Sequence, residues 1–131
     1  MRLSSGERRL TVSKDYYVEL SGAKVAPVAA PYETGIITQA GATRPFLVER
    51  EWSGPAGHYN EQWSIRQGNK VLHTCDVKLR FIKGFQSASR YVDVVDLPLE
   101  IAPGSYSLVF VVEGRFMGAA DIEVRDSPTA A

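Results

Sequence analysis

The stretch that most constrains the fold of this chain is its last long run, APGSYSLVFVVEGRFMGAADIEV, from Ala102 to Val124. Its apolar residues fall two positions apart, which is the period of a β-strand rather than of a helix. They are Tyr106, Leu108, Phe110 and Val112, followed after an interruption by Ala120, Ile122 and Val124. Gly114 and Gly118 bracket the interruption, so we predict an antiparallel hairpin closed by about five residues. A hairpin alone is marginal in water, so the rest of the chain must supply a second apolar surface.

The size and composition of the chain fit one folded domain. Its 131 residues can bury a core without disulfides or a metal, and 44% apolar with 23% charged residues is typical of a soluble protein. The single cysteine, Cys75, has no partner for an intrachain disulfide, so nothing demands an oxidising compartment. The first ten residues contain no apolar run of signal-peptide length, and no segment approaches the ~20 apolar residues of a membrane span. We therefore expect a cytoplasmic protein without a membrane partner, although a secreted domain trimmed of its signal would read the same way.

Shorter alternating runs precede the hairpin. The clearest alternating segment extends from Leu10 to Leu20 and is predicted to be one strand. The next stretch, SGAKVAPVAAPYETG, holds two prolines and is either an edge strand or an extended crossing between sheets. GIITQAG, residues 35–41, is either a short strand or a loop. In the strands predicted next, Arg50 and Glu61 occupy positions on otherwise apolar faces.

The connection between the runs HYNEQWSIRQ and KVLHTCDVKLRFI sets the register of two of these strands. A two-residue turn, Gly68-Asn69, would put Ile65 opposite Leu72 and one strand's apolar face beside the other's polar face. A three-residue connection that adds Gln67 aligns the apolar faces. We therefore predict the three-residue loop, with positive φ at Gly68 or Asn69.

These patterns predict an all-β fold, a single antiparallel β-sandwich of seven or eight strands. No helical period of useful length occurs, and turn signals separate the strands at short intervals. The predicted domain spans residues 10–125. Its largely buried core is predicted to contain Trp63, Ile65, Val77, Leu79, Tyr106, Leu108, Phe110, Ile122 and Val124. Residues 1–9 and 126–131 are predicted to be flexible end segments.

The run LPLEIAPGSYSLVFVVEG is similar to the E–F corner and following strands of immunoglobulin-like and fibronectin-type sandwiches. By this resemblance Tyr106 is the corner tyrosine, and its hydroxyl is expected to bond the backbone near the preceding turn. Trp63 is similar in place to the core tryptophan of strand C. The inter-sheet cysteine pair of antibody domains is absent. The resemblance covers about the last third of the chain, implies the fold only and assigns no functional residue.

The residue types that carry catalysis or bind metals do not form a convincing set. His73 and Cys75 lie two apart on a predicted strand and share a face, but zinc needs three or four protein ligands. The only other histidine is His58 and there is no second cysteine, so we expect a buried thiol and no metal or other cofactor. A nucleophile would also need an orienting acid and an oxyanion hole, which parallel side chains on one strand rarely allow. We predict that the protein is not an enzyme.

The charge of the chain is zero overall but uneven along it. Residues 66–90 carry six basic residues and one acidic, whereas residues 91–126 carry two basic and seven acidic. We expect these segments to neutralise one another or to form ordinary solvated faces. The basic residues are not interleaved with aromatics as in a nucleic-acid platform, so no nucleic-acid partner is predicted.

Two places are candidate binding surfaces. The loop EWSGPAGHYNEQW could form an aromatic rim from Trp52, His58 and Tyr59 for a carbohydrate or small ligand, the alternative being that the tryptophans are core. Val109 and Val111 make the outer face of the Leu108–Val112 run apolar. Either the segment VAPVAAP of the same chain or a second subunit or partner protein should cover this face. We therefore predict a non-enzymatic protein-interaction or self-association module, with a carbohydrate-binding or small-ligand-binding domain as the alternative.

Overall fold

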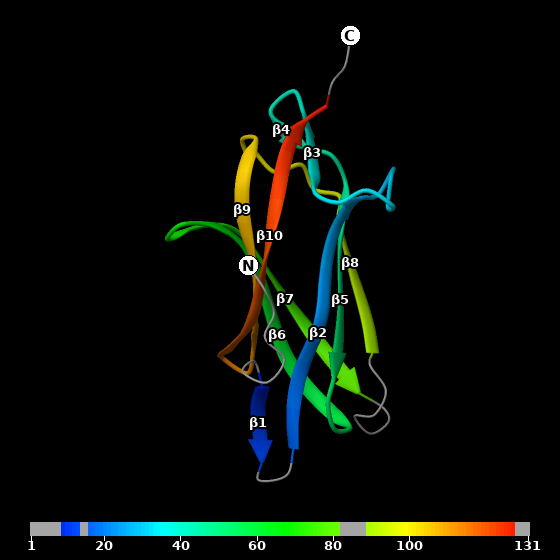
Figure 1. Ribbon diagram of the computed structural model, residues 1–131, viewed down its shortest axis with the longest axis vertical. Helices are drawn as coiled ribbons and strands as arrows, with labels where there is room; N and C mark the ends of the chain where they lie inside the picture. The colour runs from blue at the N-terminus through cyan, green and yellow to red at the C-terminus, as the bar shows by residue number, and fades with distance from the viewer. Residues whose placement is uncertain (1–8, 14–15, 82–88, 128–131) are drawn as a thin grey trace.

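The computed structural model describes residues 9–13, 16–81 and 89–127, and these residues form an all-β protein, as predicted (Figure 1). They make ten strands and no helix, arranged in two sheets. The predicted number of seven or eight strands is too low, in part because the run from Leu10 to Leu20 divides into two strands. The described part accordingly contains no helix that could cross a membrane. The predicted end segments fall mostly on residues 1–8 and 128–131, which lie outside the described residues.

One sheet has four strands in the order β1–β2–β5–β8, and all its pairings are antiparallel. Its strands are β1 (Arg9–Ser13), β2 (Tyr16–Pro27), β5 (Phe46–Ser53) and β8 (Ser89–Val95). The other sheet has six strands in the order β4–β3–β10–β9–β6–β7. Among its described pairings β10 and β3 are parallel, so this sheet is mixed rather than antiparallel throughout as predicted. Its strands are β4 (Ala42–Thr43), β3 (Ile36–Gln39), β10 (Arg115–Asp126), β9 (Gly104–Val112), β6 (Gly57–Gln67) and β7 (Lys70–Phe81). In Figure 1, β6 and β7 run at a steep angle to β9 and β10, so this sheet is strongly curled.

The predicted core is buried. Side chains from both sheets form one hydrophobic cluster, and only Val77 of the residues expected there is half-buried. The confirmed members are Trp63, Ile65, Leu79, Tyr106, Leu108, Phe110, Ile122 and Val124. The Tyr106 hydroxyl donates to the Ala102 carbonyl at 2.6 Å, which is the backbone bond expected of it. Alternation along the strands therefore predicted which side chains face inward.

The prediction of one strand from Leu10 to Leu20 is wrong, because the structure has two strands there. β1 and β2 are antiparallel, and Leu10 pairs with Val18. Paired residues in an antiparallel ladder point to the same face of the sheet. The alternation of apolar and polar residues can therefore continue through a tight turn, and two strands then look like one in the sequence. Residues 14–15, between the strands, lie outside the described residues.

The proline-containing stretch is partly strand and partly a crossing between the sheets, and its strand is not an edge strand because β2 lies between β1 and β5. The short run after it combines both of its predicted alternatives. β2 continues through Pro27 beside β5, and residues 28–35 then cross to the other sheet. GIITQAG forms β3 followed by a turn, with φ of 56° at Ala40 and 82° at Gly41. β4 returns from this turn to pair with β3.

The three-residue loop predicted between β6 and β7 is also wrong. The connection is a two-residue turn with φ of 60° at Gly68, so the predicted positive φ is present. A bulge that leaves Leu72 as the additional residue brings Ile65 opposite His73 and aligns the apolar faces. The requirement for matched faces was correct, but a bulge satisfies it rather than a longer loop.

The β9–β10 hairpin is confirmed, but its turn has two residues rather than about five. Val112 pairs with Arg115, and Glu113 and Gly114 have φ of 50° and 80°. Positive φ at both central residues is the type I′ geometry that matches strand twist. The register shifts at Met117, so a bulge on β10 interrupts the alternation that looked like a longer loop.

Candidate functional site

The largest departure from an ordinary hydrophobic core is an ion pair between the two sheets. Arg50 on β5 and Glu61 on β6 both have fully buried side chains. The Arg50 guanidinium donates two hydrogen bonds to the carboxylate, from Nε to Oε2 at 3.0 Å and from Nη2 to Oε1. This two-pronged geometry is the strong form of a charge-assisted contact, and it joins the sheets through their interior.

Two tryptophans and a third charged residue complete this buried cluster. Trp52 donates from Nε1 to Glu61 at 2.9 Å, and Trp63 donates from Nε1 to Asp93 at 2.7 Å. Arg50 Nη2 lies 3.2 Å from Asp93 Oδ2, so one cation is shared by two carboxylates. Burial raises the pKa of Glu61 above its ordinary value, although the hydrogen bonds from Arg50 oppose the rise. The cluster is closed to solvent at its centre and its polar groups bond one another, so its chemistry is structural.

The same cluster holds β8 over the six-stranded sheet. Asp93 belongs to β8, and the neighbouring Tyr91 hydroxyl contacts the backbone of Arg80 on β7. The hydroxyl accepts from the Arg80 N–H at 3.0 Å and donates to its carbonyl at 2.7 Å. The inward-pointing Tyr91 and Asp93 therefore attach β8 to the six-stranded sheet. The residues that alternate with them on β8 point outward.

The sequence carried a signal for this cluster. Arg50 and Glu61 are charged residues at positions on otherwise apolar strand faces. Opposite charges at two core-facing positions are rarely buried unless they pair. Considering the two residues together would have predicted their contact.

The aromatic rim predicted from Trp52, His58 and Tyr59 is not assembled. Trp52 is fully buried, which corrects its predicted place at the surface. Tyr59 is also buried, and its hydroxyl donates to the Pro55 carbonyl at 3.1 Å while burial raises its pKa. His58 alone is exposed. The Gly-Pro loop reverses the chain so tightly that the aromatic residues beside it return to the core.

His73 and Cys75 share one face of β7, as predicted. The thiol of Cys75 is half-buried rather than buried as expected, and His73 is half-buried as well. The His73 ring lies 5.6 Å from the Trp63 ring, and Cys75 Sγ lies 4.0 Å from Asp93 Oδ2. Burial lowers the pKa of His73 and raises that of Cys75. In the part of the chain that the structure describes, no group of three or more His, Cys, Asp or Glu is placed to hold a metal ion.

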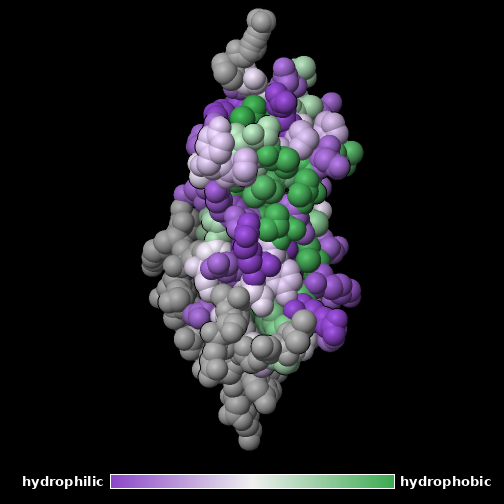
Figure 2. All heavy atoms as spheres, turned by 90° about the vertical axis from the view of Figure 1, so that its right-hand side faces the viewer, coloured by the Kyte–Doolittle hydropathy of each residue, from purple (hydrophilic) through white to green (hydrophobic). Residues whose placement is uncertain are grey.

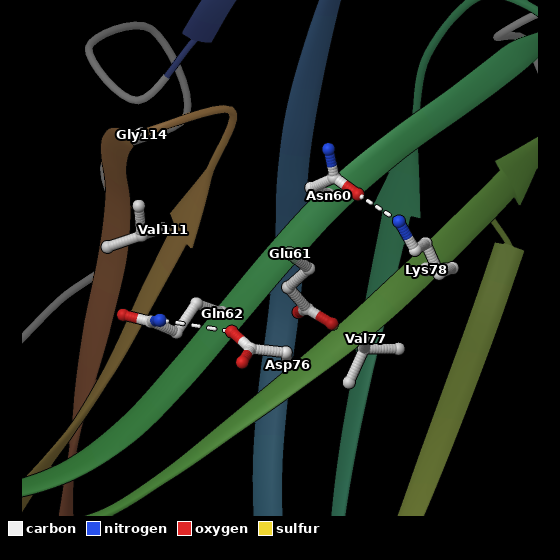
Figure 3. Close-up of a pocket in the computed structure, with 8 residues that line it drawn as sticks. All are labelled: Asn60, Glu61, Gln62, Asp76, Val77, Lys78, Val111 and Gly114. Atoms are coloured by element: carbon white, nitrogen blue, oxygen red, sulfur yellow. Dashed lines mark hydrogen bonds between the residues drawn. The ribbon is translucent and has the colours of Figure 1, made fainter.

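The outer face of the six-stranded sheet contains a hollow of about 500 Å³ (Figure 3). Its polar side chains pair across β6 and β7, since Gln62 donates to Asp76 and Lys78 donates to Asn60, each at 3.0 Å. Val111 lines the hollow from β9. The polar side chains of this hollow therefore form hydrogen bonds with one another.

Val109 and Val111 point outward on β9, as predicted, but both are half-buried. The segment VAPVAAP does not cover them. Its first residues belong to β2 in the other sheet, and the Val28 N–H donates to the Pro45 carbonyl at 3.0 Å. The alternative that VAPVAAP covers Val109 and Val111 is therefore wrong, because this segment turns toward the start of β5.

Exposed apolar residues gather on the outer face of the four-stranded sheet, and Val94 is the most exposed of the large apolar residues on the described strands. Val92 and Val94 on β8 are 42% and 59% exposed, and Leu97 just after the strand is 64% exposed. Leu47 pairs with Val94 from β5 and is half-buried on the same face. Figure 2, which views this side of the molecule, shows hydrophobic side chains gathered in a band. We call Leu47, Val92 and Val94 the β8 face.

Comparisons with known proteins concern the fold. A scan against protein-family models finds no match, and a search of curated proteins finds none. Among solved structures, the chain is similar to the alkylpurine DNA glycosylase AlkC of Pseudomonas fluorescens, bound to DNA containing an abasic site analog. The two share 18% sequence identity with a TM-score of 0.50, and the match covers 82% of this chain and 30% of that chain. The chain thus spans less than a third of the glycosylase, and the likeness shows the fold alone.

Proposed function

We propose that this chain is a non-enzymatic self-association module built on an immunoglobulin-like sandwich scaffold. Two features support this scaffold. The Tyr106 hydroxyl bonds the Ala102 carbonyl four residues upstream, and the fully buried Trp63 lies in the core. The proposed partner is protein rather than nucleic acid, because the exposed group that distinguishes this surface is apolar.

The observation that carries the proposal is the β8 face. Among the described strands, β8 has one neighbour, β5, so its other edge presents unpaired backbone groups. An edge strand with exposed valines is a ready template for another strand, and proteins ordinarily blunt such edges with charge or proline. Val92 and Val94 leave this one apolar at its centre. These residues are more exposed than Val109 and Val111, so we place the interface here.

The ligand-binding alternative gains no support of its own. It depended on an aromatic rim, and Trp52 and Tyr59 lie in the core. The exposed His58 that remains is a single side chain. A site that stacks a sugar ring needs an accessible aromatic face.

Sedimentation of the purified chain over a concentration series tests the proposal. We expect the mass to rise toward that of a dimer, and Val94→Lys to prevent the rise because a charge would enter an apolar interface. Val71→Lys is the matched control, since Val71 is a 48% exposed valine on β7, the edge of the other sheet. Both variants should keep the far-UV spectrum of the wild type. A wild-type chain that stays monomeric at high micromolar concentration would overturn the proposal.

A further inference from the structure

We infer that the partner at the β8 face is a second copy of this chain, paired antiparallel through β8 so that Arg90 of one copy lies opposite Asp96 of the other. This inference rests on the proposed self-association and adds its geometry. It begins from the order of side chains along one face of one strand.

The outward residues of β8 form a self-complementary pattern. Arg90, Val92 and Val94 are exposed and alternate with the less exposed Tyr91 and Asp93. Asp96 continues the outward series one step past the strand and is exposed as well. The series therefore reads positive, valine, valine, negative. Reversing it against itself sets each positive charge opposite a negative one and each valine opposite a valine.

The register follows from this pattern. A shift of one residue would set outward side chains opposite inward ones. A shift of two residues would set Arg90 opposite Val94 or Pro98, so both charge pairs would be lost. Only the register that pairs Arg90 with Asp96 keeps both the ionic ends and the apolar centre.

The edge is free to extend in this register. β8 bonds only β5 among the described strands, and Leu47 beside Val94 widens the apolar centre toward β5. Two four-stranded sheets would join into one continuous sheet across the two-fold axis. Their apolar outer residues would then form a single stripe across the join.

Two charged groups near the axis are compatible with the pairing. Arg90 contacts Glu49 of its own copy, yet its side chain stays 64% exposed and a guanidinium has five donors. Asp93 would face Asp93 of the second copy on the inner side. Its carboxylate is already bonded by Trp63 at 2.7 Å and lies 3.2 Å from Arg50, so it is turned inward and compensated within each copy.

Charge reversal tests the register directly. Arg90→Glu alone, or Asp96→Lys alone, places two like-charge pairs in its homodimer, and we expect each to dimerise about tenfold more weakly. An equimolar mixture of the two variants forms heterodimers in which both pairs are again opposite, so the dimer mass should return. Lys70→Glu, an exposed charge reversal on β7, should leave dimerisation unchanged.

A second measurement does not depend on charge. Val92 and Val94 of different copies would face each other, with Cβ atoms about 4.5–5.5 Å apart in such a pair. Mixing Val92→Cys with Val94→Cys under mild oxidation should therefore give a cross-linked heterodimer in larger yield than either variant gives alone.

The outcomes separate the two proposals. If the wild type self-associates but the charge-reversed mixture stays monomeric and the mixed cysteines do not cross-link preferentially, the β8 register is wrong and self-association stands. If the wild type is monomeric, both proposals fail. Far-UV spectra of the single variants show whether each has folded, and the cysteine pair decides the register if a charge variant has not.

Discussion

Glu61→Leu should be among the most destabilising single changes in this protein. The carboxylate accepts two bonds from Arg50 and one from Trp52, and no part of its side chain is exposed. Replacing Glu61 leaves the Arg50 guanidinium buried without the carboxylate that accepts two of its hydrogen bonds. Breaking a buried ion pair in this way costs about 3–5 kcal/mol. Arg50→Met should cost a similar amount, because Glu61 then keeps a buried charge with only Trp52 as donor.

The double variant should cost much less than the two single variants together. With both charges gone, the remaining penalty is mainly the Trp52 N–H left without its acceptor, about 1–3 kcal/mol. Asp93 also loses Arg50, but its side chain is partly exposed and keeps the bond from Trp63. The sum of the single changes would be about 6–10 kcal/mol, so the two residues should be strongly coupled.

Urea unfolding followed by tryptophan fluorescence measures this coupling, since Trp52 and Trp63 are both fully buried in the folded state. The matched control is Glu33→Leu, which breaks the half-exposed pair between Glu33 and Arg125 and should cost at most about 1 kcal/mol. Single-variant costs that simply add in the double variant, within about 0.5 kcal/mol, would refute the account of a mutually dependent buried pair.

Three further predictions concern stability. Tyr106→Phe removes the hydroxyl that bonds Ala102 and should cost about 0.5–1.5 kcal/mol in urea unfolding; an unchanged midpoint would show that this bond does not stabilise the corner. Leu108→Ala, at a fully buried position, should cost about 2–5 kcal/mol, whereas Val92→Ala on the exposed face of the monomer should cost far less; equal costs would contradict the assigned core. The raised pKa of Glu61 means that the folded state holds this proton more tightly than the unfolded state, so its contribution to stability falls as pH rises above the ordinary value of 4.5. The stability of the wild type relative to Glu61→Gln should therefore decrease over that range, and a rising difference would reverse the assigned direction.

Much of the fold followed from the two-residue period, but its local breaks did not. Alternation identified the inward residues of β9 and the class of the fold because one side of each strand meets the core. Alternation did not predict the bulges at Leu72 and Met117. A bulge aligns the apolar faces of two strands, but it interrupts the alternation of apolar and polar residues within one of them. The sequence required Ile65 and its partner strand to match faces. A longer loop and a bulge both achieve this match, so alternation alone does not choose between them.

The candidate surfaces show a different limit. The residues of the buried cluster were visible as exceptions in the pattern, so Arg50 and Glu61 could have been paired from the sequence. The β8 face could not have been found in this way. Val92 and Val94 look like ordinary strand residues, and the open edge beside them arises because β8 has one neighbour, β5, among the described strands. Strand order is a property of the whole topology, and a periodic pattern does not contain it.

The parallel pairing of β10 with β3 determines when this chain can finish folding. Val124 pairs with Ile36, and Arg125 reaches back to the Thr34 carbonyl at 2.9 Å. Before this part of β10 has been synthesised, the β3–β4 hairpin has no sheet to join. Contacts between segments so distant in sequence form late and slowly, because the loop they close must first lose its freedom. During synthesis on the ribosome, the edge of β3 that β10 will pair therefore stays unpaired until β10 has emerged.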